Sequence, residues 1–354
     1  MTQKPLADQS FLDHGIHRVQ ALCTALDFVA DRRETAVDAF RCMIEPWGGM
    51  RIGSTPRFRS DISDDHSPYE FSLALFQGEP EVRFLIEAQA RYPSLRDYWD
   101  AGMALSGVLE EKFGASLARL RKIEDLYRPG EMPVRFAAWH AVCVRRSGPL
   151  NFKIYLNPQV RGERQAAEIV KESLARLGLS SAIGSLPTVR APDQIKYFSL
   201  DLSPSTMSRV KVYSVYPQAS PDDIESIVRT TAAYVPGQAS EFCRHMAVMA
   251  GPFNALPVQV CLAFVEGSKI PMEATIHFPI RSYVTDDLAA RERILAYLDP
   301  DDAALYAKAI EAFAHRPLEA GSGLHSYVSL RMQQGKRSFT VYLSTELYQP
   351  SAPA

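Results

Sequence analysis

Ten short segments of the chain alternate apolar and polar residues with the two-residue period of a β-strand. They form five pairs, each close enough in sequence to be a hairpin, and the pairs recur about every 60 to 70 residues. The paired segments are 69–76 with 82–88, 134–144 with 152–157, 195–202 with 209–216, 258–265 with 272–280, and 325–332 with 338–344. This spacing predicts five antiparallel hairpins.

Between the hairpins, apolar residues recur with the spacing of amphipathic helices. Several of these stretches begin at serine or aspartate, the residues that cap helix N-termini. The stretches are 94–126, 164–179, 220–235 and 286–314. We therefore expect an N-terminal helical region over about 1–40, and then about five repeats of helix, helix, strand, strand over 41–348. The whole chain, 1–354, is expected to be a single domain.

Each strand segment has one apolar face. In the first, Phe71, Leu73 and Leu75 alternate with Glu70 and Ser72. In the last pair, the polar face carries His325, Tyr327, Ser329, Arg331, Thr340 and Tyr342. Helices would cover the apolar faces, which leaves the polar faces turned to water or ligand. The pattern predicts an α+β fold, with about ten antiparallel strands closed around a polar central chamber and an outer ring of helices. The alternative is an open sheet with helices on one face.

The charge and cysteine content exclude several classes of protein. Thirty-nine basic and 41 acidic residues give a net charge of -2, which offers no basic surface for a nucleic-acid partner. The N-terminal residues lack the apolar run of a signal peptide, and no stretch reaches the roughly 18 apolar residues of a membrane span. Five dispersed cysteines read as reduced thiols. We expect a cytoplasmic protein without a membrane partner.

Cations and phenols share the polar strand faces. Lys153 and Tyr155 form a K-x-Y pattern, and Arg209, Lys211 and Tyr213 extend it to R-x-K-x-Y. If the faces converge, these residues meet Arg83, Tyr327 and Tyr342. Lysine and arginine at alternate positions bind phosphate groups, and tyrosine ring faces stabilise a carbocation. A diphosphate leaving group beside an allylic cation needs both. The alternative is that these are solvated strand faces.

Motifs for other chemistries are absent from the sequence. There is no phosphate-binding loop, no dinucleotide fingerprint, no nucleophile elbow and no H-E-x-x-H zinc motif. Paired acids occur at 63–66 and 299–302, but neither is the D-D-x-x-D magnesium clamp, and both are expected to cap turns or helices. Protein cations would then neutralise a diphosphate, so we expect no required cofactor and at most stimulation by Mg²⁺.

Five motifs resemble the bacterial branch of the dimethylallyltryptophan-synthase-type aromatic prenyltransferases. They are SDDHSPYEFSLAL (63–75), FKIYLNP (152–158), RVKVYSVY (209–216), TIHFPIRSYV (275–284) and FTVYLSTELY (339–348). The resemblance covers roughly residues 40 to 348. It implies the ABBA barrel of ten antiparallel strands ringed by helices. It also implies metal-independent transfer of a prenyl group from dimethylallyl or geranyl diphosphate to an electron-rich aromatic ring, most often an indole.

The resemblance also assigns roles to individual residues. Glu70 matches the catalytic carboxylate that accepts a hydrogen bond from the indole N–H, with Arg83 as another possible partner. The residues implied to bind the diphosphate are Arg83, Lys153, Arg209, Lys211, Thr275 and Arg337. The residues implied to shield the cation are Tyr155, Tyr213, His277 and Tyr342. His277 replaces a tyrosine of fungal members and is expected to be neutral. Trp139 and Tyr327 are candidates for the acceptor pocket.

The sequence does not assign the removal of the ring proton to one residue. Fungal members are thought to use a lysine on the second hairpin, which here is 134–144. His140 lies on the apolar face of that segment, so we expect it under a helix unless a bulge turns it inward. Glu70 itself or the departing diphosphate remain as proton acceptors.

The resemblance implies that the substrates are dimethylallyl diphosphate and an indole acceptor. Free L-tryptophan is the expected acceptor. The alternatives are a tryptophan-containing cyclic dipeptide, another indole product or tyrosine, and geranyl diphosphate as the donor. An alternative from another class is a non-catalytic barrel that binds phosphorylated ligands. That reading explains the cations but leaves Glu70 without a role.

Overall fold

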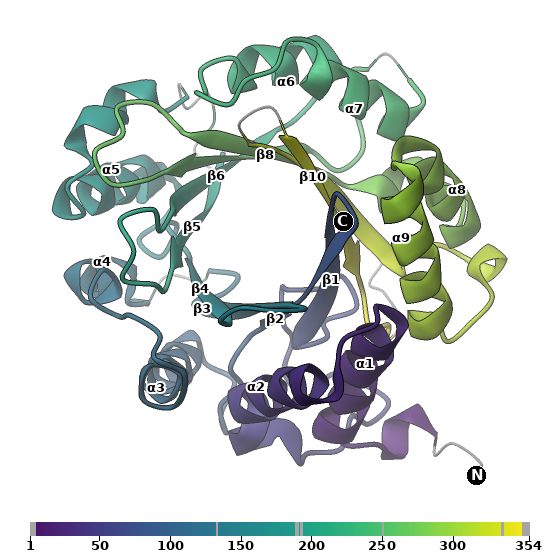
Figure 1. The fold of residues 1–354 in the computed structure, drawn as a ribbon. Coiled ribbons are helices and arrows are strands. Elements are labelled where there is room, and N and C mark those ends of the chain that lie inside the picture. The colour runs from purple at the N-terminus through teal and green to yellow at the C-terminus, as the bar shows by residue number, and fades with distance from the viewer. Residues whose placement is uncertain are drawn as a thin grey trace.

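A computed structural model describes residues 5–131, 134–187, 191, 194–249, 251–333 and 336–348. Its centre is a closed barrel of ten antiparallel strands, in which each strand pairs with its neighbours in sequence and β10 pairs with β1 (Figure 1). The strands are β1 Tyr69–Phe76, β2 Glu79–Ile86, β3 Ala138–Arg145, β4 Asn151–Leu156, β5 Ile195–Asp201, β6 Val210–Tyr216, β7 Val258–Phe264, β8 Glu273–Phe278, β9 His325–Gln333 and β10 Lys336–Leu343. The closed order confirms the predicted barrel and excludes the open sheet.

Helices surround the barrel on its outer side (Figure 1). They are α1 Phe11–Ala25, α2 Ala30–Gly48, α3 Leu95–Phe113, α4 Glu124–Tyr127, α5 Ala166–Arg176, α6 Pro221–Val228, α7 Gln238–Ala247, α8 Asp287–Tyr297 and α9 Pro300–Phe313. Within the described ranges, no helix is long and apolar enough to cross a membrane.

Helix caps explain where several helices start and stop. Ser10, Ser94, Ser220 and Asp286 each accept a hydrogen bond from a backbone N–H in the first turn of α1, α3, α6 and α8. α3 stops at Gly114, which has a φ of 70° and adopts the left-handed conformation that ends helices. The helical stretch expected over 94–126 is therefore split into α3, a 3₁₀ turn and α4.

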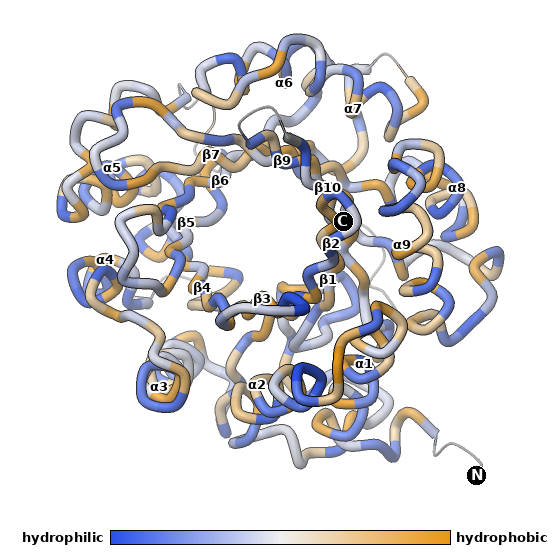
Figure 2. The backbone as a smooth tube through the Cα atoms, viewed as in Figure 1, coloured by the Kyte–Doolittle hydropathy of each residue, from blue (hydrophilic) through white to orange (hydrophobic). Residues whose placement is uncertain are grey.

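The outer face of the barrel is the hydrophobic core. Phe71 is fully buried and its ring lies 5.6 Å from that of Phe313 in α9 and 5.9 Å from that of Phe40 in α2. Leu73 and Leu75 are also fully buried on this face. The two-residue alternation therefore places apolar side chains under the helices, and Figure 2 shows hydrophilic and hydrophobic positions mixed along each strand. The polar positions are left to face the chamber.

Two histidines lie under the helices. His140 is fully buried and its Nε2 lies 2.8 Å from Ser106 Oγ in α3, as expected for a histidine on the apolar face. His325 was expected on the polar face, and that expectation is wrong. The side chain of His325 is fully buried between Tyr306 Oη (2.7 Å) in α9 and Asp287 Oδ1 (2.9 Å) in α8.

A β-bulge explains the reversed side chain of His325. Val341 pairs with Val328, but Leu343 pairs with His325, so Ser326 and Tyr327 both stand opposite the single residue Tyr342. An extra residue in one strand shifts the alternation beyond it. The bulge turns His325 outward and places Ser326 beside the chamber.

Candidate active site

Four aromatic rings form a continuous row across the chamber. The ring centroids of Tyr155 and Tyr213 are 5.8 Å apart, those of Tyr213 and His277 are 5.7 Å apart, and those of His277 and Tyr342 are 5.7 Å apart. The rings come from β4, β6, β8 and β10, which are not neighbours in the sheet. Rings on alternate strands touch only if they converge on the inside of the barrel. All four proposed shielding residues therefore face the chamber.

The row of rings is uncharged, with Tyr213 buried and the other three rings half-buried. Burial raises the pKa of Tyr342 to about 12, with Arg83 acting in the opposite direction. Burial, helped by Lys211 and Arg83, lowers the pKa of His277 to about 3. The imidazole is thus neutral at physiological pH, and its Nε2 atom has no hydrogen-bond partner among the described residues. A neutral row of rings can lie beside a carbocation without repelling it.

Cations and carboxylates line the wall on one side of this row. Arg209 forms ion pairs with Asp201 and Glu273, both at 2.8 Å. Arg83 pairs with Glu81, which also bonds Arg145 at 2.6 Å. These contacts run across strands β2, β3, β5 and β8 and the residue just before β6, so they gather at one level of the barrel.

Two lysines of this group, Lys153 and Lys211, form no ion pair with a carboxylate among the described residues. The ammonium groups of Lys153 and Lys211 make no hydrogen bond to any residue in the described ranges, although both side chains are buried. Burial raises the pKa of Asp201, but Lys211, Arg209 and Lys153 together outweigh it and hold that pKa well below its usual value. Burial, together with Arg209 and Lys153, lowers the pKa of Lys211 to about 7. Neither lysine therefore has a carboxylate of its own in the described part of the chain, and Lys211 is only partly charged near pH 7.

Arg331 belongs to the same group of cations but was not among the predicted diphosphate residues. It stands directly opposite Thr275 in the pairing of β8 with β9, and its pKa is lowered by burial while Glu273 raises it. Its alternation with Ser329 and Tyr327 was the signal in the sequence. We call Arg83, Lys153, Arg209, Lys211 and Arg331 the cation cluster.

Arg337 does not face the chamber, which argues against the diphosphate contact predicted for it. It pairs with Asp299 at 3.2 Å, and its guanidinium lies 5.5 Å from the ring centroid of Tyr297 in α8. Arg337 shares the outer face of β10 with Phe339 and Val341, because the alternation assigns odd-numbered residues of this strand to the helices.

Glu70 lies on the chamber face at the far side of the aromatic row. Its side chain is 8% exposed and accepts a hydrogen bond from Ser326 Oγ at 2.7 Å. Burial raises the pKa of Glu70 to about 8, although the Ser326 bond lowers it in part. Arg83, considered as a partner for Glu70, instead bonds Glu81 and, at 3.4 Å, Thr340. No cation bonds Glu70 among the described residues, so the carboxylate is free to accept a bond from a ligand.

Trp139 and Tyr327 lie near this end of the chamber. The Trp139 ring stacks on Phe136 with a centroid separation of 4.1 Å and lies 5.3 Å from the ring of Tyr197. Tyr327 receives a weak hydrogen bond from Gln259 at 3.5 Å. The rings of Phe136, Trp139 and Tyr197 form an aromatic wall, which suits an indole.

Sequence reasoning missed a second buried carboxylate at this end. The Trp139 Nε1–H donates to Glu87 Oε1 at 3.2 Å, and Glu87 is only 1% exposed. The alternation of residues 83, 85 and 87 placed this glutamate on the polar face, but nothing in the sequence showed that it would be buried. Its position shows that the acceptor end of the chamber has two carboxylates, Glu70 and Glu87.

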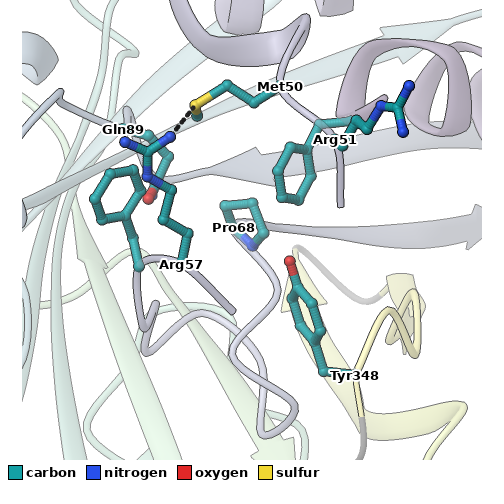
Figure 3. Close-up of a pocket in the computed structure, with 8 residues that line it drawn as sticks. Met50, Arg51, Arg57, Pro68, Gln89 and Tyr348 are labelled. Carbon is teal, nitrogen blue, oxygen red and sulfur yellow. Dashed lines mark hydrogen bonds between the residues drawn. The ribbon is translucent and has the colours of Figure 1, made fainter. Parts of the chain in front are cut away.

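A separate cavity of about 300 Å³ lies beside the ends of β1 and β2 (Figure 3). In it, Arg57 donates a hydrogen bond to Met50 Sδ at 3.7 Å. Its lining residues are Phe11, Met50, Arg51, Arg57, Phe58, Pro68, Gln89 and Tyr348. None of the residues proposed above lines this cavity. In the described part of the chain, no group of three or more His, Cys, Asp or Glu side chains is placed to hold a metal ion.

Known proteins share both the sequence pattern and the fold of this chain. The model of the family described as tryptophan dimethylallyltransferase matches residues 25–312. PriB, solved as a complex with the product diphosphate, is 31% identical with a TM-score of 0.90, and the match covers 98% of this chain and 99% of PriB.

Two further solved structures are similarly close. The 5-dimethylallyl tryptophan synthase of Streptomyces coelicolor is 29% identical with a TM-score of 0.90 and 98% of each chain covered. The 6-dimethylallyltryptophan synthase of Micromonospora olivasterospora is 31% identical with a TM-score of 0.88, and the match covers 98% of this chain and 100% of that one. Both were solved with DMASPP and Trp. The chain belongs to the tryptophan dimethylallyltransferase family and is an aromatic prenyltransferase with the ABBA fold.

Proposed function

We propose that the protein transfers the dimethylallyl group of dimethylallyl diphosphate to a ring carbon of L-tryptophan. The observation that carries this proposal is the order of groups along the chamber. The cation cluster lies on one side of the four aromatic rings, and Glu70 lies on the other. Similar proteins solved with DMASPP and Trp support the choice of donor and acceptor.

The cation cluster assists departure of the diphosphate. Its five cations, with Arg145 on Glu81, outnumber the three buried carboxylates Glu81, Asp201 and Glu273, so positive charge is in excess. A bound diphosphate supplies the missing negative charge. As the allylic C–O bond breaks, its electron pair goes to the diphosphate oxygen, and the cluster stabilises the charge that develops there. Thr275, opposite Arg331, is placed to donate a further hydrogen bond.

The aromatic row holds the allylic cation until the acceptor attacks. The rings of Tyr155, Tyr213, His277 and Tyr342 stabilise positive charge and exclude water that would convert the cation to an alcohol. Glu70 accepts the indole N–H bond and raises the electron density of the ring. A ring carbon attacks the cation, a C–C bond forms, and loss of the proton from that carbon restores aromaticity.

We propose that turnover needs no metal ion, because buried side chains neutralise the diphosphate. Activity is expected to persist in excess EDTA, with at most a modest stimulation by Mg²⁺. The measurement is the initial rate of prenylated product after the protein has been stripped with EDTA. Complete loss of activity that stoichiometric Mg²⁺ restores would show that the cation cluster cannot act alone.

A panel of acceptors tests the proposed substrate. L-Tryptophan, a tryptophan-containing cyclic dipeptide, a simple indole and L-tyrosine are each incubated with dimethylallyl or geranyl diphosphate. Mass spectrometry and NMR identify the products. We expect one C5 unit on the ring of tryptophan, at a kcat/KM above that of the other pairs. Turnover of the cyclic dipeptide or tyrosine with tryptophan inert would overturn the choice of acceptor. Tight donor binding without turnover of any acceptor would favour a non-catalytic binding protein.

A further inference from the structure

Glu87 is the second carboxylate at the acceptor end, and the transfer described above does not use it. Its backbone N–H donates to the carbonyl oxygen of Pro68 at 3.0 Å, which continues the pairing of β2 with β1 by one residue. Leu85 stands opposite Glu70 in that pairing, so Glu87 is the diagonal neighbour of Glu70 on the same face. Diagonal neighbours lie about 7–8 Å apart. Two carboxylates therefore flank one space in the chamber wall.

The carboxylate of Glu87 is held at one oxygen and free at the other. Oε1 accepts the hydrogen bond from Trp139. The Ser60 hydroxyl lies close enough to the carboxylate to lower its pKa, but no group among the described residues forms a well-aligned hydrogen bond to the buried Oε2. A buried polar atom without a partner costs free energy, which is recovered if a ligand or a proton occupies it. The fixed oxygen orients the carboxylate, and the free oxygen is available to the acceptor.

The groups packed around Glu87 supply no cation to neutralise it. Trp139 on β3 and Ser60 in the segment before β1 are uncharged. Asp61 in the same segment is a carboxyl group that pairs with Arg135 at 3.7 Å. From α3, Tyr98 presents a buried hydroxyl group that likewise has no partner in the described ranges. Burial raises the pKa of Glu87 to about 7, while Ser60 and Trp139 lower it in part and Asp61 raises it.

We propose that Glu87 is the general base that removes the ring proton after the dimethylallyl group has attached. The inference rests on the proposed function. Once the C–C bond has formed, the attacked carbon carries both the new substituent and its hydrogen, and the ring is positively charged. The C–H bond breaks, its electron pair restores the aromatic ring, and Glu87 Oε2 takes the proton. No oxidant or further reactant is needed.

The position of Glu87 favours it over the other proton acceptors. Glu70 already holds the indole N–H, and the diphosphate lies beyond the aromatic row. A base that titrates near the working pH is also the most effective in proton transfer. The competing roles for Glu87 are to position the Trp139 ring or to bind the ammonium group of the amino acid.

The variant Glu87→Gln tests the proposal, because its amide oxygen still accepts the Trp139 hydrogen bond but the side chain cannot take a proton. We expect kcat with L-tryptophan to fall by about 10², with the KM for tryptophan nearly unchanged. Proton removal should then limit the rate, so tryptophan deuterated at the ring carbons should show a primary isotope effect that the unmodified enzyme lacks. The exposed Glu79→Gln is the matched control and should behave as the unmodified enzyme.

Two additional measurements separate the competing roles. Trp139→Phe removes the hydrogen bond to Glu87 and part of the aromatic ring that packs on Phe136, but it leaves a carboxylate that can take the proton. If Glu87 is the base, this variant should show a smaller isotope effect than Glu87→Gln even where it binds tryptophan more weakly, whereas a positioning role predicts the same loss of kcat in both variants. In the unmodified enzyme, lowering the pH first protonates Glu70, which should slow attack on the cation without an isotope effect, and then Glu87, which should raise the isotope effect. This measurement does not depend on the folding of a variant.

Each outcome decides the proposal. An unchanged kcat without an isotope effect in Glu87→Gln, or a raised KM alone, would show that Glu87 is not the base. A raised KM alone would assign it instead to the ammonium group of the acceptor. If the unmodified enzyme makes no C5 product from tryptophan, the proposed function itself fails, which is distinguishable from failure of the base.

Discussion

Single residues were placed correctly wherever the two-residue alternation of a strand was unbroken. Lys153, Lys211 and Tyr213 follow the alternation, and the structure brings all three to the chamber. Arg337 was assigned to the diphosphate because of its motif, although the alternation places it on the apolar face of its strand. In the structure it faces the helices. Arg331 was on the predicted face, but its neighbours on other strands were unknown. Which cations share one level of a barrel depends on strand tilt, and a single sequence does not show it.

The placement of these two arginines predicts opposite effects of substitution. Arg331→Ala removes a half-buried cation that we propose contacts the diphosphate, so it should lower kcat/KM for the donor by about 30-fold, equivalent to about 2 kcal/mol. Arg337→Ala removes an exposed ion pair with Asp299 and should change kcat/KM by less than about threefold. Steady-state kinetics with dimethylallyl diphosphate checks both. Equal effects from the two substitutions would contradict the assignment of the cation cluster.

The lowered pKa of Lys211, about 7, predicts how diphosphate binding depends on pH. Below this pKa the ammonium is charged and attracts the diphosphate. Above it, the free enzyme must take up a proton to bind, so affinity should fall by up to about tenfold per pH unit between pH 7 and 9. Lys211→Arg keeps its charge over this range and should lack that fall. Calorimetric titration of both proteins with inorganic diphosphate compares them directly, and identical pH profiles would contradict the prediction.

Elements were predicted in type but not always in extent. The helical stretch over 94–126 contains Gly114, which ends α3, and the stretch over 286–314 is split between α8 and α9 at Leu298. The bulge in β9 had a larger effect on the site than these helix ends, because it turned the His325 side chain outward and brought Ser326 within hydrogen-bond distance of Glu70. A bulge leaves no mark in an alternating pattern until the partner strand is known. Hence the hydrogen bond of the proposed catalytic carboxylate could not be predicted.

The outward orientation of His325 predicts a structural role. His325→Ala removes its contacts with Tyr306 and Asp287 in a fully buried site, so it should lower the free energy of unfolding by about 3 kcal/mol. Urea unfolding measures this, and the exposed His17→Ala should have almost no effect. A His325 variant with normal stability but weakened donor binding would mean that the side chain faces the chamber.

The whole molecule separates two chemical tasks along one chamber. Closure of the barrel was predictable from the sequence. Five hairpins that each have one polar face and one apolar face covered by helices can enclose their polar faces by closing into a barrel. The order of groups along the axis was not, because it depends on the register of all ten pairings. In the proposed function, the cation cluster assists ionisation of the donor and Glu70 assists capture of the cation, and the rings of Tyr155, Tyr213, His277 and Tyr342 lie between them. The two tasks should therefore be separable by substitution.

The ratio of prenylated tryptophan to dimethylallyl alcohol in Glu70→Gln tests this separation most directly. Glutamine keeps the size of the side chain and still accepts a hydrogen bond from Ser326 or the indole. Above its pKa of about 8, Glu70 is ionised and carries the charge that activates the ring, which glutamine lacks, so the comparison is made there. We predict that donor ionisation continues and water captures the cation, so the ratio falls by about 10² relative to the unmodified enzyme. An unchanged ratio would contradict the account, because it would show that Glu70 does not act on the acceptor.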